Sequence, residues 1–345
     1  MSLLTQIREM LTVDVNSMDL DVVARHSTAQ KFCDMTSNQA IVHGQASLPT
    51  RRNLLEAAIE YVRKTPPQEG EEFEQAVVDV LTVLLAKEVY PYLTGNVHAQ
   101  TSPSAAYDTE KTVKHARKLV DLFTNHGIPT ERVCIKIPAT PESLLACREL
   151  QASGIQTLAT CLFSFPQAVA ASQAGCTYVA PYFNELRVHF QPAVWVKYAD
   201  PKTQHPMSSV ILNIVHAFRE LKSKTLVMPA RFVYPSSAVF NTSSCCPLSI
   251  VIALVSLSPN HLTLSAGVLD ALSALPSLEP EAFMPPAVSA FPSIKGDYLA
   301  DEGALLLKAL AEEHEVQRKL ADALAIFGEK EAETRQLVKA LIADK

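Results

Sequence analysis

The stretch "RVCIKIPATPESLLACRELQASGIQTLATCLF" (residues 132–163) contains two short apolar runs separated by an amphipathic segment. Each apolar run predicts a buried strand. The segment between them predicts a helix with Thr140 as its N-cap, Pro141 in its first turn and Gly154 at its end. A strand, a helix and a second strand in this order form the unit from which parallel sheets are built.

Strand-like and helix-like segments alternate along the rest of the chain. The predicted strands are 11–15, 31–35, 94–100, 132–139, 155–163, 176–183, 225–232 and 261–272, the last of which turns into a helix. The predicted helices are 51–64, 71–93, 108–127, 140–154, 164–175 and 206–222. Eight strands favour a closed (β/α)8 TIM barrel over an open sheet. We expect one domain over residues 1–345, with 302–343 as an additional C-terminal helical layer.

Composition and charge argue against several classes of protein. The chain is 48% hydrophobic and 19% charged, as globular proteins are. Its net charge of −6 gives no basic surface for nucleic acid. The longest apolar stretch, 245–258, is interrupted by Pro247 and is too short to span a bilayer, and the first residues do not resemble a secretory signal. The seven cysteines lack metal-ligand spacing, so we expect reduced thiols in a cytoplasmic protein without a metal.

Lys136 lies in an apolar run, close to the end of its predicted strand. Lysine is among the residues least often buried, so its presence there needs an explanation. In a (β/α)8 barrel, side chains at the carboxyl ends of the strands converge on one site. Desolvation in such a site favours the neutral amine of a lysine, which attacks a carbonyl and forms a Schiff base. The alternative is an ordinary lysine whose stem follows the strand while its ammonium reaches water.

Several segments together resemble a known family in their order and spacing. These segments are "DMTSNQA" (34–40), "YDTEKTVKHARKLV" (107–120), "ERVCIKIPAT" (131–140) and "SGIQTLATCLFSFPQAVAASQAG" (153–175). They resemble the transaldolase family, over roughly residues 5–235 and 261–342. The resemblance implies a TIM barrel without a cofactor, in which Lys136 forms a Schiff base with a ketose.

The resemblance also exposes a change at the first strand. Transaldolases carry there an aspartate that donates and accepts protons near the lysine, and its place is taken by Asn16. Asparagine orients a neighbour by hydrogen bonding but does not transfer a proton. Asp14, two residues earlier, faces the same side of a strand, so we expect it to substitute in part. The alternative for Asp14 is a strand carboxylate with no chemical role.

A second change concerns the general base. The family has a glutamate that activates a water molecule, and Gln100 holds its place. Glutamine cannot act as a general base. Ser102 and Ser104 stand where the family has an aspartate and an arginine.

Other family positions are retained. Thr160 matches the threonine that helps to hold the catalytic water, and Asn38 matches an asparagine that contacts the substrate. We place Thr36 with Asn38 and Ser102 among the substrate-binding residues. We place Gln100, Asn16 and Asp14 beside Lys136 and Thr160 among the catalytic ones.

The phosphate-binding end has changed as well. Two arginines and a serine grip the sugar phosphate in transaldolases, and their places hold Glu185, Val233 and Ala180. A carboxylate about 4 Å from a phosphate dianion costs on the order of 1–4 kcal/mol. Arg231 and Arg187 are nearby in the sequence and offer replacement guanidinium groups. The alternative for Glu185 is an ordinary solvated loop acid.

One segment is longer than the family requires. "NTSSCCPLSIVIALVSLS" (241–258) is an atypical apolar insertion where a short connection would suffice. It is either a lid element or sequence foreign to the working protein, such as retained non-coding sequence.

We therefore expect a transaldolase-like enzyme that makes, breaks or transfers a C–C unit through Lys136, on a carbonyl substrate that is non-phosphorylated or atypical. The first alternative is an ordinary transaldolase of the pentose phosphate pathway, acting on sedoheptulose 7-phosphate and glyceraldehyde 3-phosphate. The second is a catalytically inactive binding protein of the same fold. The expected partner is a small carbonyl compound or sugar, with a homodimer as an open possibility.

Overall fold

The structure, a computed structural model, describes the chain except residues 68, 231–245, 288–290 and 344–345. The strands are β1 (Thr12–Val15), β2 (Val97–Gln100), β3 (Val133–Pro138), β4 (Gln156–Leu162), β5 (Tyr178–Pro181), β6 (Leu226–Val227) and β7 (His261–Leu264). The first α-helices are α1 (Leu3–Met10), α2 (Leu20–His26), α3 (Gln39–Ala46), α4 (Arg52–Lys64), α5 (Phe73–Val89), α6 (Thr109–Asn125), α7 (Pro141–Ala152) and α8 (Phe165–Gln173). They are followed by α9 (Arg187–Phe190), α10 (Pro201–Gln204), α11 (Pro206–Glu220), α12 (Cys246–Ser256), α13 (Ala266–Ala274), α14 (Ala304–Glu312) and α15 (His314–Ala343).

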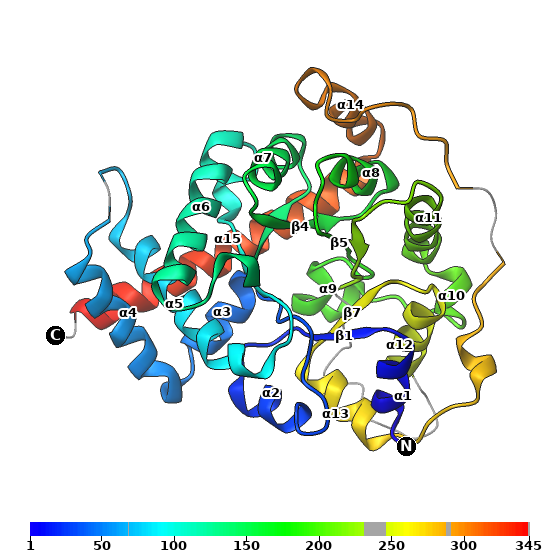
Figure 1. The fold of residues 1–345 in the computed structure, drawn as a ribbon, viewed down its shortest axis with the longest axis horizontal. Coiled ribbons are helices and arrows are strands. Elements are labelled where there is room, and N and C mark those ends of the chain that lie inside the picture. The colour runs from blue at the N-terminus through cyan, green and yellow to red at the C-terminus, as the bar shows by residue number, and fades with distance from the viewer. Residues whose placement is uncertain (68, 231–245, 288–290, 344–345) are drawn as a thin grey trace.

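The strands form a two-stranded and a five-stranded parallel sheet, and helices surround them (Figure 1). Strands β2 to β6 are neighbours in chain order, and β1 pairs with β7. Met35 joins the two groups because it bridges both Val15 of β1 and Val97 of β2. On the other side, the Asn260 N–H, just before β7, donates to the Val227 carbonyl of β6 at 3.0 Å. The predicted (β/α)8 TIM barrel is confirmed.

The predicted strand 31–35 is reduced to single bridges. Residues 32 and 35 pair with Leu93, Val15 and Val97, without a continuous ladder. Gly95 passes very close to this segment. A Cβ at that position would lie 2.0 Å from the Asp34 carboxylate, so the crossing tolerates only glycine.

Local capping signals fix the helices that flank β3. Asp108 caps α6 by accepting a hydrogen bond from the backbone N–H three residues further on, and Thr140 caps α7 in the same way. Gly127 and Gly154 follow these two helices with φ of +86° and +79°, a region that favours glycine. The predicted boundaries of both helices are confirmed.

Part of the insertion 241–258 forms a regular element. Helix α12 covers Cys246–Ser256 and contacts α10. Its side chains Ile250, Val251 and Leu254 are buried in the common core. Residues 241–245 lie outside the described part of the chain.

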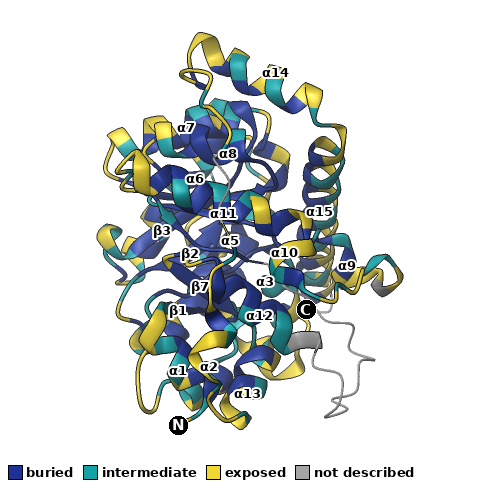
Figure 2. Ribbon diagram, turned by 90° about the vertical axis from the view of Figure 1, so that its right-hand side faces the viewer, coloured by how far each residue is buried: buried dark blue, intermediate teal, exposed yellow. Residues whose placement is uncertain are grey.

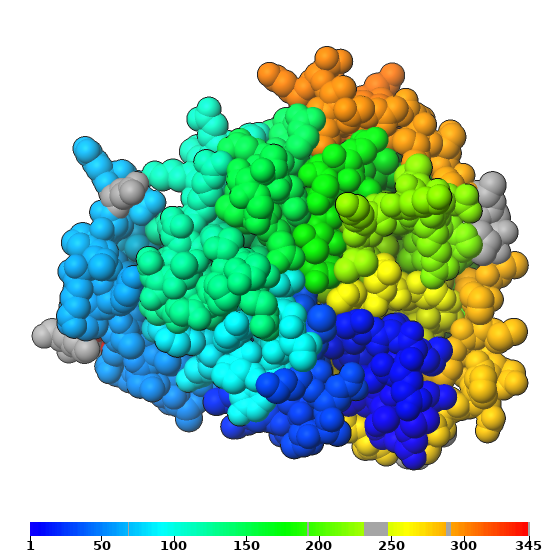
Figure 3. Space-filling model, in the orientation of Figure 1, coloured from blue at the N-terminus to red at the C-terminus, as the bar shows by residue number. Residues whose placement is uncertain are grey.

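The C-terminal segment 302–343 supplies α14 and α15. In Figure 1, α15 runs behind the barrel, and in the space-filling view from the same side it is largely hidden (Figure 3). It contacts residues that follow β2 and β5, so it crosses the carboxyl ends of the strands, which we call the barrel mouth. Its buried side is a helical stripe: Val316, Leu320, Ala323, Leu324, Phe327, Glu331, Thr334, Val338 and Leu341.

Burial follows this architecture. Figure 2 shows the buried residues concentrated on the strands and on the helix faces that pack against them. Among the described helices, none is both long and apolar enough to cross a membrane.

Candidate active site

Lys136 lies inside the barrel. The residue belongs to β3 and is only 2% exposed. Its register partners are Gln100 on β2 and Leu158 on β4. Register partners in a parallel sheet point to the same face. Lys136 and Gln100 therefore project side by side from neighbouring strands, at the end of the barrel covered by α15.

Asn16, which directly follows β1, is in contact with Thr36. The Thr36 hydroxyl donates to Asn16 Oδ1 at 3.0 Å and lies 2.8 Å from the Thr263 hydroxyl of β7. Asn16 is partly buried, while Thr36 and Thr263 are buried. The structure thus joins two predicted site residues in one polar cluster and adds Thr263, which no sequence motif indicated.

Thr160 has a partner that the sequence did not reveal. Its hydroxyl donates to the Tyr182 hydroxyl at 2.9 Å. Both residues are fully buried, and Tyr182 directly follows β5. Two hydroxyl groups in contact at a strand end can hold a water or substrate oxygen between donor and acceptor positions.

Gln100 and Asn38 lie close together at the mouth. Gln100 Nε2 donates to Gln39 Oε1 at 2.8 Å, and Asn38 caps α3 by accepting the N–H groups of Ala40 and Ile41. On these two side chains, the buried atoms Asn38 Nδ2 and Gln100 Oε1 have no hydrogen-bond partner among the described residues. Such atoms in a native interior call for a water or ligand.

Ser102 leads to an acid that sequence reasoning missed. Its hydroxyl donates to Glu331 Oε2 at 2.7 Å and contacts Ser104 at 2.9 Å. Glu331 comes from α15 and is 8% exposed. Burial raises the pKa of the Glu331 carboxyl, although the bond from Ser102 opposes the change. The signal in the sequence is an acid on the apolar stripe of a helix.

The Glu331 side chain belongs to a buried polar network. Gln75 Nε2 of α5 donates to its Oε1 at 3.3 Å. The Ser102 N–H donates to His115 Nδ1 at 2.9 Å, and His115 Nε2 lies 3.2 Å from Asp79. These contacts tie α5, α6 and α15 to the end of β2.

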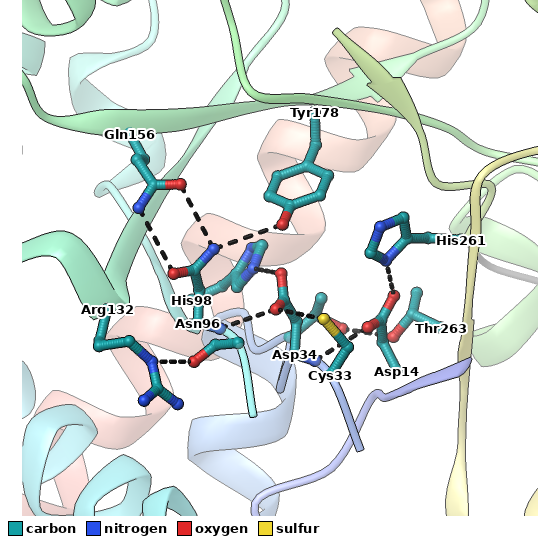
Figure 4. Close-up of polar contacts among 12 residues, drawn as sticks. Asp14, Cys33, Asp34, Asn96, His98, Arg132, Gln156, Tyr178, His261 and Thr263 are labelled. Carbon is teal, nitrogen blue, oxygen red and sulfur yellow. Dashed lines mark hydrogen bonds and ion pairs between the residues drawn. The ribbon is translucent and has the colours of Figure 1, made fainter. Parts of the chain in front are cut away.

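Asp14 lies in β1, two residues before Asn16, and Figure 4 shows it beside His261. Its carboxylate is 2.9 Å from His261 Nδ1 and accepts the Asp34 N–H at 2.9 Å. Burial raises the pKa of Asp14 to about 6. These contacts of Asp14 join β1, β7 and the segment around Asp34.

Asp34 forms a second buried pair beside it. Its carboxylate accepts the Asn96 N–H at 2.7 Å and lies 2.8 Å from His98 Nε2 (Figure 4). Although burial opposes this, the contact with His98 lowers the pKa of Asp34 to about 2.

Asp14, His261 and Cys33 bring three metal-ligand atoms within 4.8 Å of one another. Asp14 and His261 already form a hydrogen bond with each other, so we assign this cluster a structural role.

Glu185 and Ala180 lie near the end of β5. Glu185 Oε2 is 2.8 Å from Arg318 of α15, and Glu185 Oε1 is 3.6 Å from Arg187. Arg318 also contacts Asp322 at 2.7 Å. Ala180 is buried within β5 and offers only a methyl group. Two of the three positions that differ from the phosphate-binding residues of the family, Glu185 and Ala180, thus lie near the barrel mouth.

Arg231, predicted to bind substrate, and Val233 lie outside the described residues. Of the other predicted site residues, the structure brings Lys136 and Gln100 together on neighbouring strands, and Asn16 and Thr36 into one cluster. It directs Ser102 toward α15 and Asp14 toward His261.

Comparison with known proteins agrees with this geometry. The family described as "Transaldolase/Fructose-6-phosphate aldolase" matches residues 12–334. A transaldolase of Prochlorococcus marinus is 33% identical over 233 residues, 67% of this chain and 68% of that protein. Transaldolases of Saccharomyces cerevisiae and Bos taurus are 31% and 30% identical, over 70% and 66% of this chain and 71% and 66% of their own lengths. The chain therefore belongs to the transaldolase/fructose-6-phosphate aldolase family.

Proposed function

We propose that the protein is a Schiff-base enzyme that makes, breaks or transfers an aldol or ketol unit on a carbonyl substrate without a phosphate group. The Lys136 amine attacks the carbonyl carbon of a ketone, and the carbinolamine loses water to give an imine. The imine accepts the electron pair released when the neighbouring C–C bond breaks, and an aldehyde leaves. The remaining enamine is protonated and hydrolysed, or it attacks a second aldehyde.

The observation that carries this proposal is the place of Lys136. Lys136 is only 2% exposed on a central strand, and burial of its charged form disfavours folding, which a functional role would explain. It lies in register with Gln100, in a chain that belongs to the transaldolase/fructose-6-phosphate aldolase family. The hydroxyl and amide groups of Thr36, Asn16 and Thr160 would supply hydrogen bonds for a hydroxylated substrate.

The proposed lack of a phosphate rests on charge. At the mouth, Glu185 is paired with Arg318, and Arg318 contacts two further carboxylates, Glu315 and Asp322. Arg187 also faces Glu185 and Asp322, at 3.6 and 4.0 Å. These guanidinium groups are already matched by acids, so a phosphate would compete with carboxylates for them.

Borohydride reduction tests the proposal. The protein is incubated with dihydroxyacetone, hydroxyacetone or fructose 6-phosphate, reduced, and assayed for covalently bound ketone. We expect an adduct with the two unphosphorylated ketones, lost in Lys136→Met and kept in the control Lys111→Met, whose side chain is 74% exposed. No adduct with any of the ketones would contradict the proposal. Robust turnover of fructose 6-phosphate with erythrose 4-phosphate would favour the ordinary transaldolase activity instead.

A further inference from the structure

Glu331 is a buried acid that the family resemblance does not assign. The buried stripe of α15 consists of nine residues, of which Glu331 is the one with a charged side chain. A carboxylate in an apolar helix stripe disfavours folding, because its charged form loses hydration. The hydrogen bonds from Ser102 and Gln75 offset part of this cost. A chemical role would be a further reason for an acid at this position.

The surroundings of Glu331 supply that reason. A small cavity, with about 20 Å³ open to the centre of a water molecule, is lined by Glu331, Gln100, Gln39 and Asn38, among others. This volume suits roughly one water. Two of the lining groups, Asn38 Nδ2 and Gln100 Oε1, are buried and without a partner among the described residues. One is a donor and the other an acceptor, as a bound water requires.

Lys136 does not line the cavity, but its register neighbour Gln100 does. Ser102, two residues further along the chain from Gln100, holds Glu331 at 2.7 Å. Gln100 carries an amide where the family has the carboxylate of a glutamate. It therefore cannot accept a proton, but its amide can orient a water.

On this basis we infer that Glu331 is the general base of the enzyme, and that it acts on a water held by Asn38 and Gln100. The inference rests on the proposed Schiff-base function. In the hydrolysis step, the water oxygen bonds to the carbon of the protonated imine, and the C=N electron pair returns to the Lys136 nitrogen, which keeps its proton. The proton released by the water passes to the Glu331 carboxylate. The carbinolamine then collapses as its hydroxyl proton moves to nitrogen and the C–N bond breaks, which releases the ketone and the free amine.

The electrostatics of the site agree with this role. Burial raises the pKa of Glu331, which brings a carboxyl closer to the range where a general base is efficient near neutral pH. The neighbouring Ser102 hydroxyl and Gln75 amide both donate to Glu331, so its orientation is fixed from α5 and from the end of β2.

Enzyme-catalysed exchange of the dihydroxyacetone carbonyl oxygen with water labelled in heavy oxygen tests this step, since the exchange requires imine formation and hydrolysis. The variant is Glu331→Gln, which keeps shape and an acceptor oxygen. Its control is Glu333→Gln, two residues away on the exposed side of the same helix. We expect exchange to fall by about 10²–10⁴-fold in Glu331→Gln and by less than about twofold in Glu333→Gln. The borohydride adduct on Lys136 should still form, given a longer incubation.

The outcomes separate the two proposals. If the wild-type protein forms no adduct, the Schiff-base function itself fails. If the wild-type protein forms the adduct but Glu331→Gln exchanges oxygen as fast as the wild type, Glu331 is not the base. If Glu331→Gln unfolds or forms no adduct, Ser102→Ala is used, which leaves the carboxylate but removes its hydrogen-bond donor. Unchanged exchange in a folded Ser102→Ala protein, together with the failure of Glu331→Gln to fold, would assign Glu331 a structural role and overturn the inference.

Discussion

Arg318 of helix α15 and Glu185, which follows strand β5, form an ion pair of 2.8 Å at the barrel mouth. The two residues are far apart in the sequence, and the pair joins the C-terminal helix to the end of the sheet. A phosphate group arriving at this edge would meet the Glu185 carboxylate and an arginine that is already neutralised. Under the proposed function, the pair links the packing of α15 to the choice of substrate.

Removal of the Glu185 charge should shift this choice. In Glu185→Gln, Arg318 and Arg187 lose a carboxylate partner and become available to a phosphate dianion. We expect kcat/KM for fructose 6-phosphate, relative to that for fructose, to rise by about tenfold, which corresponds to about 1.4 kcal/mol. Glu315 is an exposed carboxylate that also pairs with Arg318, so Glu315→Gln is the control. An unchanged ratio in Glu185→Gln would show that Glu185 does not set phosphate selectivity.

The hydroxyl of Thr160 should matter for turnover but not for folding of the barrel. Thr160→Val keeps the shape of the side chain and removes the hydrogen bond to Tyr182. We expect kcat to fall by about tenfold to a hundredfold, the effect of one buried hydrogen bond. Thr160→Ser, which retains the hydroxyl, should recover most of the rate in steady-state assays. Equal rates for the serine and valine variants would contradict a role for this hydroxyl.

The C-terminal helix should contribute strongly to stability through Phe327. This ring is fully buried on the stripe that faces the barrel. Phe327→Ala leaves a cavity, and we expect the free energy of unfolding to fall by about 3–5 kcal/mol. Leu307→Ala on α14 is the matched control, because Leu307 is 59% exposed and its loss should change stability by less than about 0.5 kcal/mol. Urea unfolding followed by circular dichroism measures both, and similar losses in the two variants would argue against a packed α15.

Asp34 should make the protein sensitive to acid. Although burial opposes it, the contact with His98 holds the pKa of Asp34 at about 2, below its ordinary value of 3.8. A folded-state pKa below the unfolded one stabilises the protein above the unfolded value, and this stabilisation is lost as the pH falls toward about 2. The stability difference between wild type and Asp34→Asn should therefore be about 1 kcal/mol smaller at about pH 3 than at about pH 5.

Urea titrations at the two pH values measure this difference. Asp121→Asn, at an exposed position on α6, is the control and should differ from wild type by a similar amount at both. A difference for Asp34→Asn that grows as the pH falls would reverse the expected sign and exclude a stabilising Asp34–His98 pair.

Local patterns in the sequence were sufficient to predict the strands and helices around β3. Thr140, Gly154 and the apolar runs around them define β3, α7 and β4 through contacts between near neighbours, which is why these elements could be predicted. The segment 31–35 was less regular than its composition indicated, because its pairing depends on the close passage of Gly95, a contact between separate parts of the chain.

The site was predicted less completely, for the same reason. The position of Lys136 followed from its strand and from the family motif. The contacts of Thr160 with Tyr182 and of Ser102 with Glu331 join residues 22 and 229 positions apart, and no local pattern contains such information. Glu331 was nevertheless visible as an acid on an apolar helix stripe, a conflict with local preference of the kind that marks functional sites.

The most direct test of the account is the mass of the peptide that contains Lys136 after borohydride reduction in the presence of dihydroxyacetone. A Schiff base predicts that this peptide gains the mass of the reduced ketone and that other lysine peptides remain unmodified. An unmodified Lys136 peptide in a folded protein, with reductant and ketone both in excess, would contradict the central claim that this buried amine condenses with a carbonyl.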